Sequence, residues 1–136
     1  MSKKIKVLVV DDEIFIVRSV RHLLEEKGLQ VESAHDGAEA LAKVENDKFD
    51  IVITDYYMPA LNGKELLCII KERFPHTLVI IISGFCSVED RLDLLFKGAF
   101  NCIKKPFKVN EIESIINTAI KLCNKQGIKE SGVRNA

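Results

Sequence analysis

Acidic, hydroxyl and amine side chains follow four apolar runs of the chain, each at the point where the run ends. The set, in chain order, is Asp11, Asp12, Glu13, Asp55, Ser83 and Lys105. Crowded carboxylates repel one another unless a cation lies among them, and hard oxygen ligands of this kind suit Mg²⁺, with Asp11, Asp12 and Asp55 as the expected cage. A carboxylate can also form an aspartyl phosphate, while a lysine charge and a serine hydroxyl can hold phosphoryl oxygens. The residue types therefore favour metal-assisted phosphoryl transfer.

Each of these residues also has an ordinary structural explanation. An Asp–Asp pair can end a strand and cap a helix, Asp55 precedes a turn that contains Pro59, and Ser83 can act as a cap. A Lys–Pro pair alone carries little information. The functional interpretation depends on joint placement, because all of these residues follow predicted strands at the same end.

Short apolar runs alternate with longer segments of helical period, which is typical of a parallel sheet with helices on both faces. Strands are expected at residues 5–10, 31–34, 49–54, 77–82 and 100–104. Helices are expected at 13–27, after Asp36 as cap, around 66–70, from the Ser87 cap to about 97, and at 109–123. Five such units predict an α/β fold with a doubly wound five-stranded parallel sheet, whose functional residues gather beyond the carboxyl ends of the strands.

The composition fits one globular domain. The chain has 136 residues, of which 47% are hydrophobic and 29% charged. Residues 1–123 are assigned to the domain, and the mostly polar residues 124–136 are expected to form a frayed tail or the start of a linker. Basic and acidic residues are equal at 20 each, which argues against direct nucleic-acid binding. The apolar run before Asp11 is too short for a signal peptide or a membrane span, so we expect a cytoplasmic protein.

The cysteines show no metal-binding pattern. Cys68, Cys86, Cys102 and Cys123 lie at least 16 residues apart and form neither a CxxC nor a Cys/His motif. We expect them to be reduced and mostly buried, as small apolar residues. The three histidines are scattered, and no catalytic or metal-binding role is expected for them.

The ordered motifs resemble the receiver domains of two-component response regulators. The motifs are VVDDE at 9–13, DYYMP at 55–59 followed by Asn62–Gly63, ISG at 82–84 and KPF at 105–107. The resemblance covers residues 5–123 and implies that Asp55 is the phosphoacceptor. It also implies direct Mg²⁺ ligands from Asp12 and Asp55, with Asp11 acting largely through water and a further ligand from the Tyr57 carbonyl.

The same resemblance implies roles for the other strand-end residues. The Ser83 hydroxyl and the Lys105 ammonium would pair with the phosphoryl group, Lys104 would be solvated, and the peptide bond before Pro106 would be cis. The implied architecture is flavodoxin-like, a (βα)5 fold with strand order 2-1-3-4-5.

The function implied by the resemblance is a signalling switch rather than an enzyme. A sensor histidine kinase or a phosphotransfer protein would supply the phosphoryl group from a phosphohistidine. The domain would promote its own phosphotransfer and slow autodephosphorylation, and change conformation to control an output protein or domain. We expect a monomer or a phosphorylation-dependent dimer. The cognate kinase, the output, and whether the chain is free-standing or part of a longer regulator stay open.

Three positions bear on the family's usual readout and lifetime. The family usually has Tyr or Phe three residues before the lysine, where this chain has Cys102. Phe100 shares the strand parity of Cys102 and is expected on the same face, without occupying the same pocket. Because the usual aromatic readout is absent, output should depend mainly on the loop after Ser83 and on the helix after that loop. Tyr57 and Phe85 occupy positions that flank the approach of a hydrolytic water. Neither ring can orient water, so we expect a long-lived phosphorylated state.

Two other classes fit the sequence less well. A flavodoxin-like binding module would need Ser, Thr and Gly after the first strand to hold a flavin phosphate, where this chain has carboxylates that would repel it. A phosphatase of the haloacid dehalogenase type would carry its nucleophile in a DxD motif after the first strand and normally a cap domain. Neither feature is found in the sequence.

Overall fold

The structure is a computed structural model that describes residues 4–84 and 86–135, with side chains described as far as residue 125. Strands and helices alternate along the chain. Their bounds are β1 Lys6–Val10, α1 Ile14–Glu26, β2 Gln30–Ala34, α2 Gly37–Asn46, β3 Ile51–Asp55, α3 Gly63–Arg73, β4 Leu78–Ser83, α4 Val88–Phe96, β5 Asn101–Lys104 and α5 Val109–Asn135. None of the helices in this part of the chain combines the length and apolarity that a membrane span requires.

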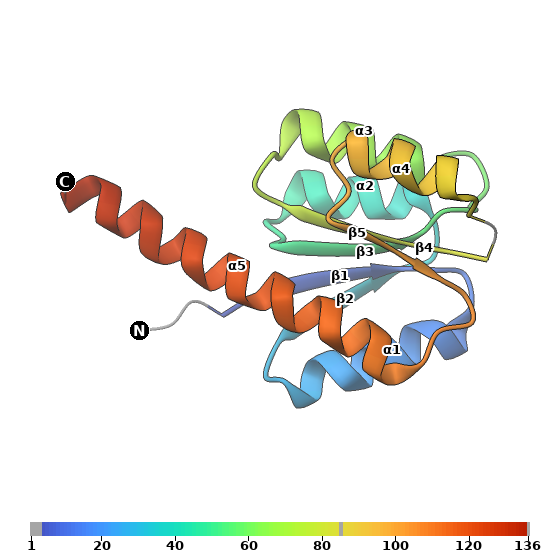
Figure 1. The fold of residues 1–136 in the computed structure, drawn as a ribbon, viewed down its shortest axis with the longest axis horizontal. Helices are drawn as coiled ribbons and strands as arrows, with labels where there is room; N and C mark the ends of the chain where they lie inside the picture. The colour runs from blue at the N-terminus through green and yellow to red at the C-terminus, as the bar shows by residue number, and fades with distance from the viewer. Residues whose placement is uncertain (1–3, 85, 136) are drawn as a thin grey trace.

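The five strands form one parallel sheet in the order β2-β1-β3-β4-β5, as expected. Helices α1 and α5 cover one face of the sheet, and α2, α3 and α4 cover the other (Figure 1). The strand order reverses at β1, because β2 lies on one side of it and β3 on the other. Ligand sites of doubly wound sheets lie at such a reversal, beyond the carboxyl ends of the strands.

Alternate residues of each strand enter two separate hydrophobic clusters. Val7 and Val9 of β1 pack in the cluster with α1 and α5, while Leu8 and Val10 pack in the cluster with α2, α3 and α4. Each fully buried aliphatic side chain contributes about 1.5–3 kcal/mol to stability. A slip of one residue would exchange the two sets between the faces, so burial on both sides fixes the strand register, and with it the position of every strand end.

The segment between β3 and α3 is held against its surroundings at two glycines. A Cβ on Gly63 would lie 2.5 Å from the Asp55 carbonyl oxygen, and a Cβ on Gly37 would lie 2.2 Å from the Leu61 carbonyl oxygen. Ala60 between them has a left-handed backbone with φ of 67°. Asn62 caps α3 in a capping box with Glu65. The backbone behind Asp55 is therefore closely packed from two sides.

Two sequence-based expectations about the end of the chain are wrong. Phe100 precedes β5, and it packs against the cluster opposite to that of Cys102. The alternation of side chains holds only along a continuous extended strand, so parity did not apply to Phe100. The final helix α5, which was expected to end at Cys123, continues to Asn135 (Figure 1), while the assignment of residues 124–136 to a tail or the start of a linker stays a prediction. No proline follows Pro106, and the segment contains Lys, Gln and Glu, which favour helix.

Candidate functional site

The predicted site residues converge at the carboxyl edge of the sheet. Asp11 follows β1 and Asp55 ends the neighbouring β3, whose Thr54 is paired with Val10. Ser83 ends β4 and is paired with Lys104, so Lys105 follows immediately beyond the next strand. Parallel strands place all of these ends on one edge, which is why chain order alone predicted the convergence.

Four carboxylates form a cluster at this edge. One oxygen from each of Asp11, Asp12, Glu13 and Asp55 lies within 4.8 Å of the others. Asp11 and Asp55 are 2% and 6% exposed, while Asp12 and Glu13 face solvent. The backbone amide of Glu13 donates to Asp11 Oδ1 at 2.9 Å, and that of Tyr57 donates to Asp55 Oδ1 at 3.4 Å. Backbone donors thus orient the two buried carboxylates.

Lys105 places its ammonium group inside this cluster. Its Nζ lies 3.0 Å from Asp11 Oδ2, 3.0 Å from Glu13 Oε1 and 3.4 Å from Asp55 Oδ2. Its backbone amide donates to the Ser83 carbonyl oxygen at 2.8 Å, and the peptide bond to Pro106 is cis, as expected. Lys104, in contrast, is exposed, also as expected. The backbone of β4 therefore fixes where the Lys105 side chain starts.

Burial and charge act in opposite directions on the titrating groups. Burial raises the pKa of Asp11 and of Asp55 above the usual value of 3.8, although hydrogen bonds from backbone amides and Lys105 oppose the shift. Burial would lower the pKa of Lys105, but hydrogen bonds to Glu13 and Asp11 and the charges of Asp11 and Asp55 raise it overall. The lysine therefore stays charged, and one ammonium faces four carboxylates.

The donor set fits a hard divalent cation. Four carboxylates and one ammonium leave three negative charges uncompensated when all are ionised, and the donors are all oxygens. Mg²⁺ takes oxygen ligands from a few carboxylates and keeps several waters. Three of the four predicted ligand residues, Asp11, Asp12 and Asp55, belong to the cluster, and the Tyr57 carbonyl stays a predicted ligand.

Glu13 belongs to the cluster although it was not among the predicted ligands. It is the N-cap residue of α1, yet its side chain makes no capping hydrogen bond and reaches Lys105 instead. Ser, Thr, Asp and Asn are the usual N-cap residues, so a glutamate there was a signal available in the sequence. Its position directly after Asp11 and Asp12 was a second such signal.

Of the two residues predicted to flank the path of a hydrolytic water, Tyr57 lies in the part of the chain that the structure describes. The Tyr57 side chain is 54% exposed, and its ring lies 4.8 Å from the Tyr56 ring, tilted by 58°. Phe85 lies outside the described residues. A Cβ on Gly84 would meet no described atom within 4 Å, so the backbone directly after Ser83 has open space beside it. The Tyr57 ring thus stands at the rim of the site, with about half of its surface open to solvent.

The cysteines differ in burial more than expected. Cys102 and Cys123 are buried, Cys86 is half-buried, and Cys68 is exposed on α3. None of the four, all of which lie in the described part of the chain, forms a disulfide. The expectation of mostly buried residues thus fails for Cys68, because helix α3 turns that position outward.

Comparison with known proteins places this architecture among signalling proteins. The family model of the response regulator receiver domain matches residues 7–117. The transcriptional regulatory protein TrcR of Mycobacterium tuberculosis is 36% identical over 108 residues, which cover 79% of this chain and 42% of TrcR. This chain spans about half the length of the curated relatives it matches, from 42% to 59%.

Two solved structures show the same fold at similar sequence identity. A CheY-like receiver domain protein from Methanospirillum hungatei JF-1 superposes with a TM-score of 0.84 at 31% identity, covering 91% of this chain and 99% of that chain. The CheX–CheY–BeF3–Mg²⁺ complex from Borrelia burgdorferi gives a TM-score of 0.81 at 31% identity, covering 85% and 89%. The likeness therefore extends over nearly the whole of each solved chain.

Proposed function

This chain belongs to the response regulator receiver-domain family, whose members accept a phosphoryl group in two-component signalling, and we propose that Asp55 is its phosphoacceptor. The observation that carries the proposal is the contact of Lys105 with Asp11, Glu13 and Asp55 in one acidic cluster. A buried carboxylate with an oxygen beside a fixed ammonium is suited to attack a phosphorus atom. The same ammonium can then balance the charge of the phosphoryl oxygens.

One group lies beside each carboxylate oxygen of Asp55, and together they orient Asp55 to attack a phosphorus atom. The Tyr57 amide holds Oδ1, and the Lys105 ammonium lies beside Oδ2. In the proposed step a carboxylate oxygen forms a bond to phosphorus while the bond from phosphorus to the donor breaks. The leaving group is the imidazole of a phosphohistidine, or acetate when acetyl phosphate is the donor. The close packing of Gly63 against the Asp55 carbonyl keeps the nucleophile in place.

Ser83 and Lys105 are proposed to hold the transferred group. Ser83 is buried at the end of β4, and its carbonyl oxygen is bonded to the Lys105 amide, so the two residues share one local backbone framework. The Ser83 hydroxyl would donate a hydrogen bond to one phosphoryl oxygen. The Lys105 ammonium would replace its contact with Asp55 by a contact with another phosphoryl oxygen. These shifts would carry the signal into the loop after Ser83.

Asp11, Asp12 and Asp55, with the Tyr57 carbonyl, are proposed to hold Mg²⁺, and Glu13 lies close enough to take part through water. A bound Mg²⁺ would neutralise the carboxylates and the oxygens of the transferring phosphoryl group. The CheX–CheY complex named above contains Mg²⁺ and BeF3, which supports this assignment.

Receiver domains interact with histidine kinases and output domains, and several relatives of this chain are transcriptional regulators. We propose a sensor histidine kinase or phosphotransfer protein as donor here, and a separate output protein or domain as target. The proposed switch loses its phosphoryl group slowly by itself, because Tyr57 offers no carboxamide or carboxylate to orient an attacking water. The chain would act as a monomer or as a dimer formed on phosphorylation.

Incubation with acetyl phosphate and Mg²⁺, followed by intact mass measurement, tests the phosphoacceptor. The parent should gain one phosphoryl group, while Asp55→Asn should gain none, because the amide is not a nucleophile. Removal of Mg²⁺ with EDTA should abolish labelling of the parent. Glu72→Gln is the matched control, since it removes one exposed carboxylate on α3 away from the site and should label like the parent. Equal labelling of Asp55→Asn and the parent would refute the assignment.

A further inference from the structure

A small cavity lies between the loop after β4, the start of α4 and strand β5. Its volume is about 120 Å³, and it is lined by Cys86, Ser87, Val88, Arg91, Cys102, Ile103 and Lys104. None of these residues belongs to the acidic cluster. The lining combines two thiols with two cationic side chains, a combination that the phosphoryl-transfer chemistry above does not use.

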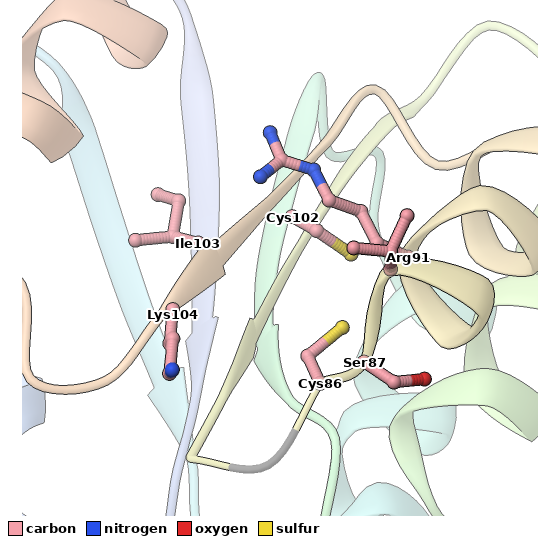
Figure 2. A pocket seen from close by; sticks show the side chains of 7 residues that line it. Cys86, Ser87, Arg91, Cys102, Ile103 and Lys104 are labelled. Atoms are coloured by element: carbon pink, nitrogen blue, oxygen red, sulfur yellow. The ribbon is translucent and has the colours of Figure 1, made fainter.

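The two thiols in this cavity face one another. Figure 2 shows the sulfur atoms of Cys86 and Cys102 directed toward each other across the cavity, from the loop after β4 and from β5. Cys86 also lies near enough to raise the pKa of the Cys102 thiol. Thiols that line one small cavity, carried by segments 16 residues apart in sequence, can form a bond when the two segments approach each other.

The two thiols differ in access to solvent. Cys86 is half-buried and can meet a small reagent that enters the cavity, whereas Cys102 is 6% exposed. Burial, followed by the charge and hydrogen bond of Cys86, raises the pKa of Cys102 to about 12. Reactivity toward oxidants requires thiolate character and exposure, so Cys102 resists direct oxidation and Cys86 is the thiol that reacts first.

The other two cysteines are separated from this pair. Cys123 packs in the cluster formed with α1 and α5, on the opposite face of the sheet from Cys102. Cys68 lies on the exposed surface of α3. The fold therefore places Cys86 and Cys102 at one cavity, while Cys68 lies on the surface of α3 and Cys123 in the core on the other face of the sheet.

We propose that Cys86 and Cys102 form a redox-active thiol pair, a modification site for small hydroperoxides. The Cys86 sulfur attacks one peroxide oxygen, so that an S–O bond forms, the O–O bond breaks, and the alcohol or water leaves with the thiol proton. The Cys102 sulfur then attacks the Cys86 sulfenic acid. The S–S bond forms, and water leaves with the second proton, so the two thiols lose two electrons and the peroxide is reduced.

The position of the bridge follows from the strand ends. Cys86 lies three residues after Ser83, and Cys102 lies three residues before Lys105. A disulfide would tie the loop after β4 directly to β5. The thiol chemistry requires neither Asp55 nor a metal, so it can succeed or fail independently of the proposed phosphoryl transfer.

Hydrogen peroxide treatment of the full chain, with free thiols then blocked and the product digested by trypsin without reduction, tests the pair. The four cysteines fall in four separate tryptic peptides, at residues 65–71, 74–91, 98–104 and 122–125. Before the free thiols are blocked, we expect the intact chain to lose about 2 Da, the mass of two hydrogens, and after digestion we expect peptides 74–91 and 98–104 to be linked. Dithiothreitol should restore the original mass.

Three variants separate this pair from other oxidation. Cys86→Ser should abolish the linked peptide, and Cys102→Ser should leave a sulfenic acid on Cys86 that a dimedone probe captures. Cys68→Ser is the matched control and should form the link like the parent. The proposal is overturned if the link joins Cys68, Cys123 or two chains, or if Cys86 proceeds to sulfinic acid with no link to Cys102. Cys86→Ser alters a half-buried loop position, so it serves as the test if Cys102→Ser fails to fold.

Discussion

Without a bound cation, the acidic cluster should destabilise the fold, and Asp55→Asn should therefore make the metal-free domain more stable. At an effective dielectric constant of about 20, two carboxylates at the 4.8 Å limit of the cluster repel by about 3.5 kcal/mol, a lower bound for closer pairs, and an ion pair at 3.4 Å attracts by about 5 kcal/mol. Asp55 faces one such attraction from Lys105 and three repulsions. Two of the repulsions come from exposed groups and are reduced about twofold by solvent.

The sum of these charge interactions favours the neutral amide of Asp55→Asn by about 1–2 kcal/mol. The variant also avoids the cost of burying a charged carboxylate, which is the largest cause of the raised pKa of Asp55. For a chain of this size that gain corresponds to an increase in Tm of about 5 °C. The size of this stability gain depends on pH. Folded Asp11 and Asp55 bind protons more tightly than the unfolded chain, so stability of the parent should fall as pH rises above the usual value of 3.8. The advantage of Asp55→Asn should therefore be larger at pH 7 than at pH 4.

Mg²⁺ should reverse this order. A ligand that binds only the folded state at 100 times its Kd stabilises by about 2.7 kcal/mol, and Asp55→Asn loses a carboxylate ligand and should gain less. Thermal unfolding at pH 7, in EDTA and at increasing Mg²⁺ concentrations, measures the stability without metal and the stabilisation by Mg²⁺. Glu72→Gln is the control and should change Tm little under either condition. A variant less stable than the parent in EDTA, or stabilised equally by Mg²⁺, would refute the electrostatic reasoning.

Three further perturbations test how the site is built. Gly63→Ala should cost about 2–3 kcal/mol and slow phosphorylation, since its Cβ would lie 2.5 Å from the carbonyl oxygen that ends β3. Gly84→Ala, whose Cβ meets no described atom within 4 Å, is the control for stability in urea unfolding. Ala60→Gly should stabilise by about 0.5–1 kcal/mol because φ is 67° there, and a lower urea midpoint would contradict this. Tyr57→Asn combined with Phe85→Glu should shorten the aspartyl phosphate lifetime roughly tenfold in Mg²⁺, and an unchanged lifetime by intact mass would argue against shielding.

The strands and the strand-end residues were predictable because both depend on local patterns. Apolar runs rich in Val and Ile mark buried parallel strands, and in a doubly wound sheet every such strand ends at the same edge. Asp11, Asp55 and Lys105 could thus be placed together from chain order. The cis bond before Pro106 came from the resemblance to the family rather than from the residues.

Features that depend on the direction of a side chain, or on contacts with segments distant in sequence, could not be predicted from local patterns. Phe100 lies one residue before β5, where the alternation of faces has not begun, so its packing followed from tertiary contacts instead. Helix α5 extends beyond Cys123, where the sequence predicted its end, because helix propensity accumulates where no proline intervenes. The facing thiols of Cys86 and Cys102 arise from the return of β5 alongside β4, and no spacing rule for cysteines contains that geometry.

Lys105 shows why the site's resting state matters to its function. Before any phosphoryl group arrives, its ammonium already has three carboxylate neighbours, at 3.0, 3.0 and 3.4 Å. The longest of these contacts is with Asp55, and an exchange of that contact for a phosphoryl oxygen leaves the other two intact. Lys105 can therefore move little and still change partners. If Asp55 is the phosphoacceptor, as proposed, the signal would be carried by what shifts when Asp55 gains bulk and charge. The loop that follows Ser83 would respond, because the Ser83 carbonyl oxygen accepts a hydrogen bond from the Lys105 amide.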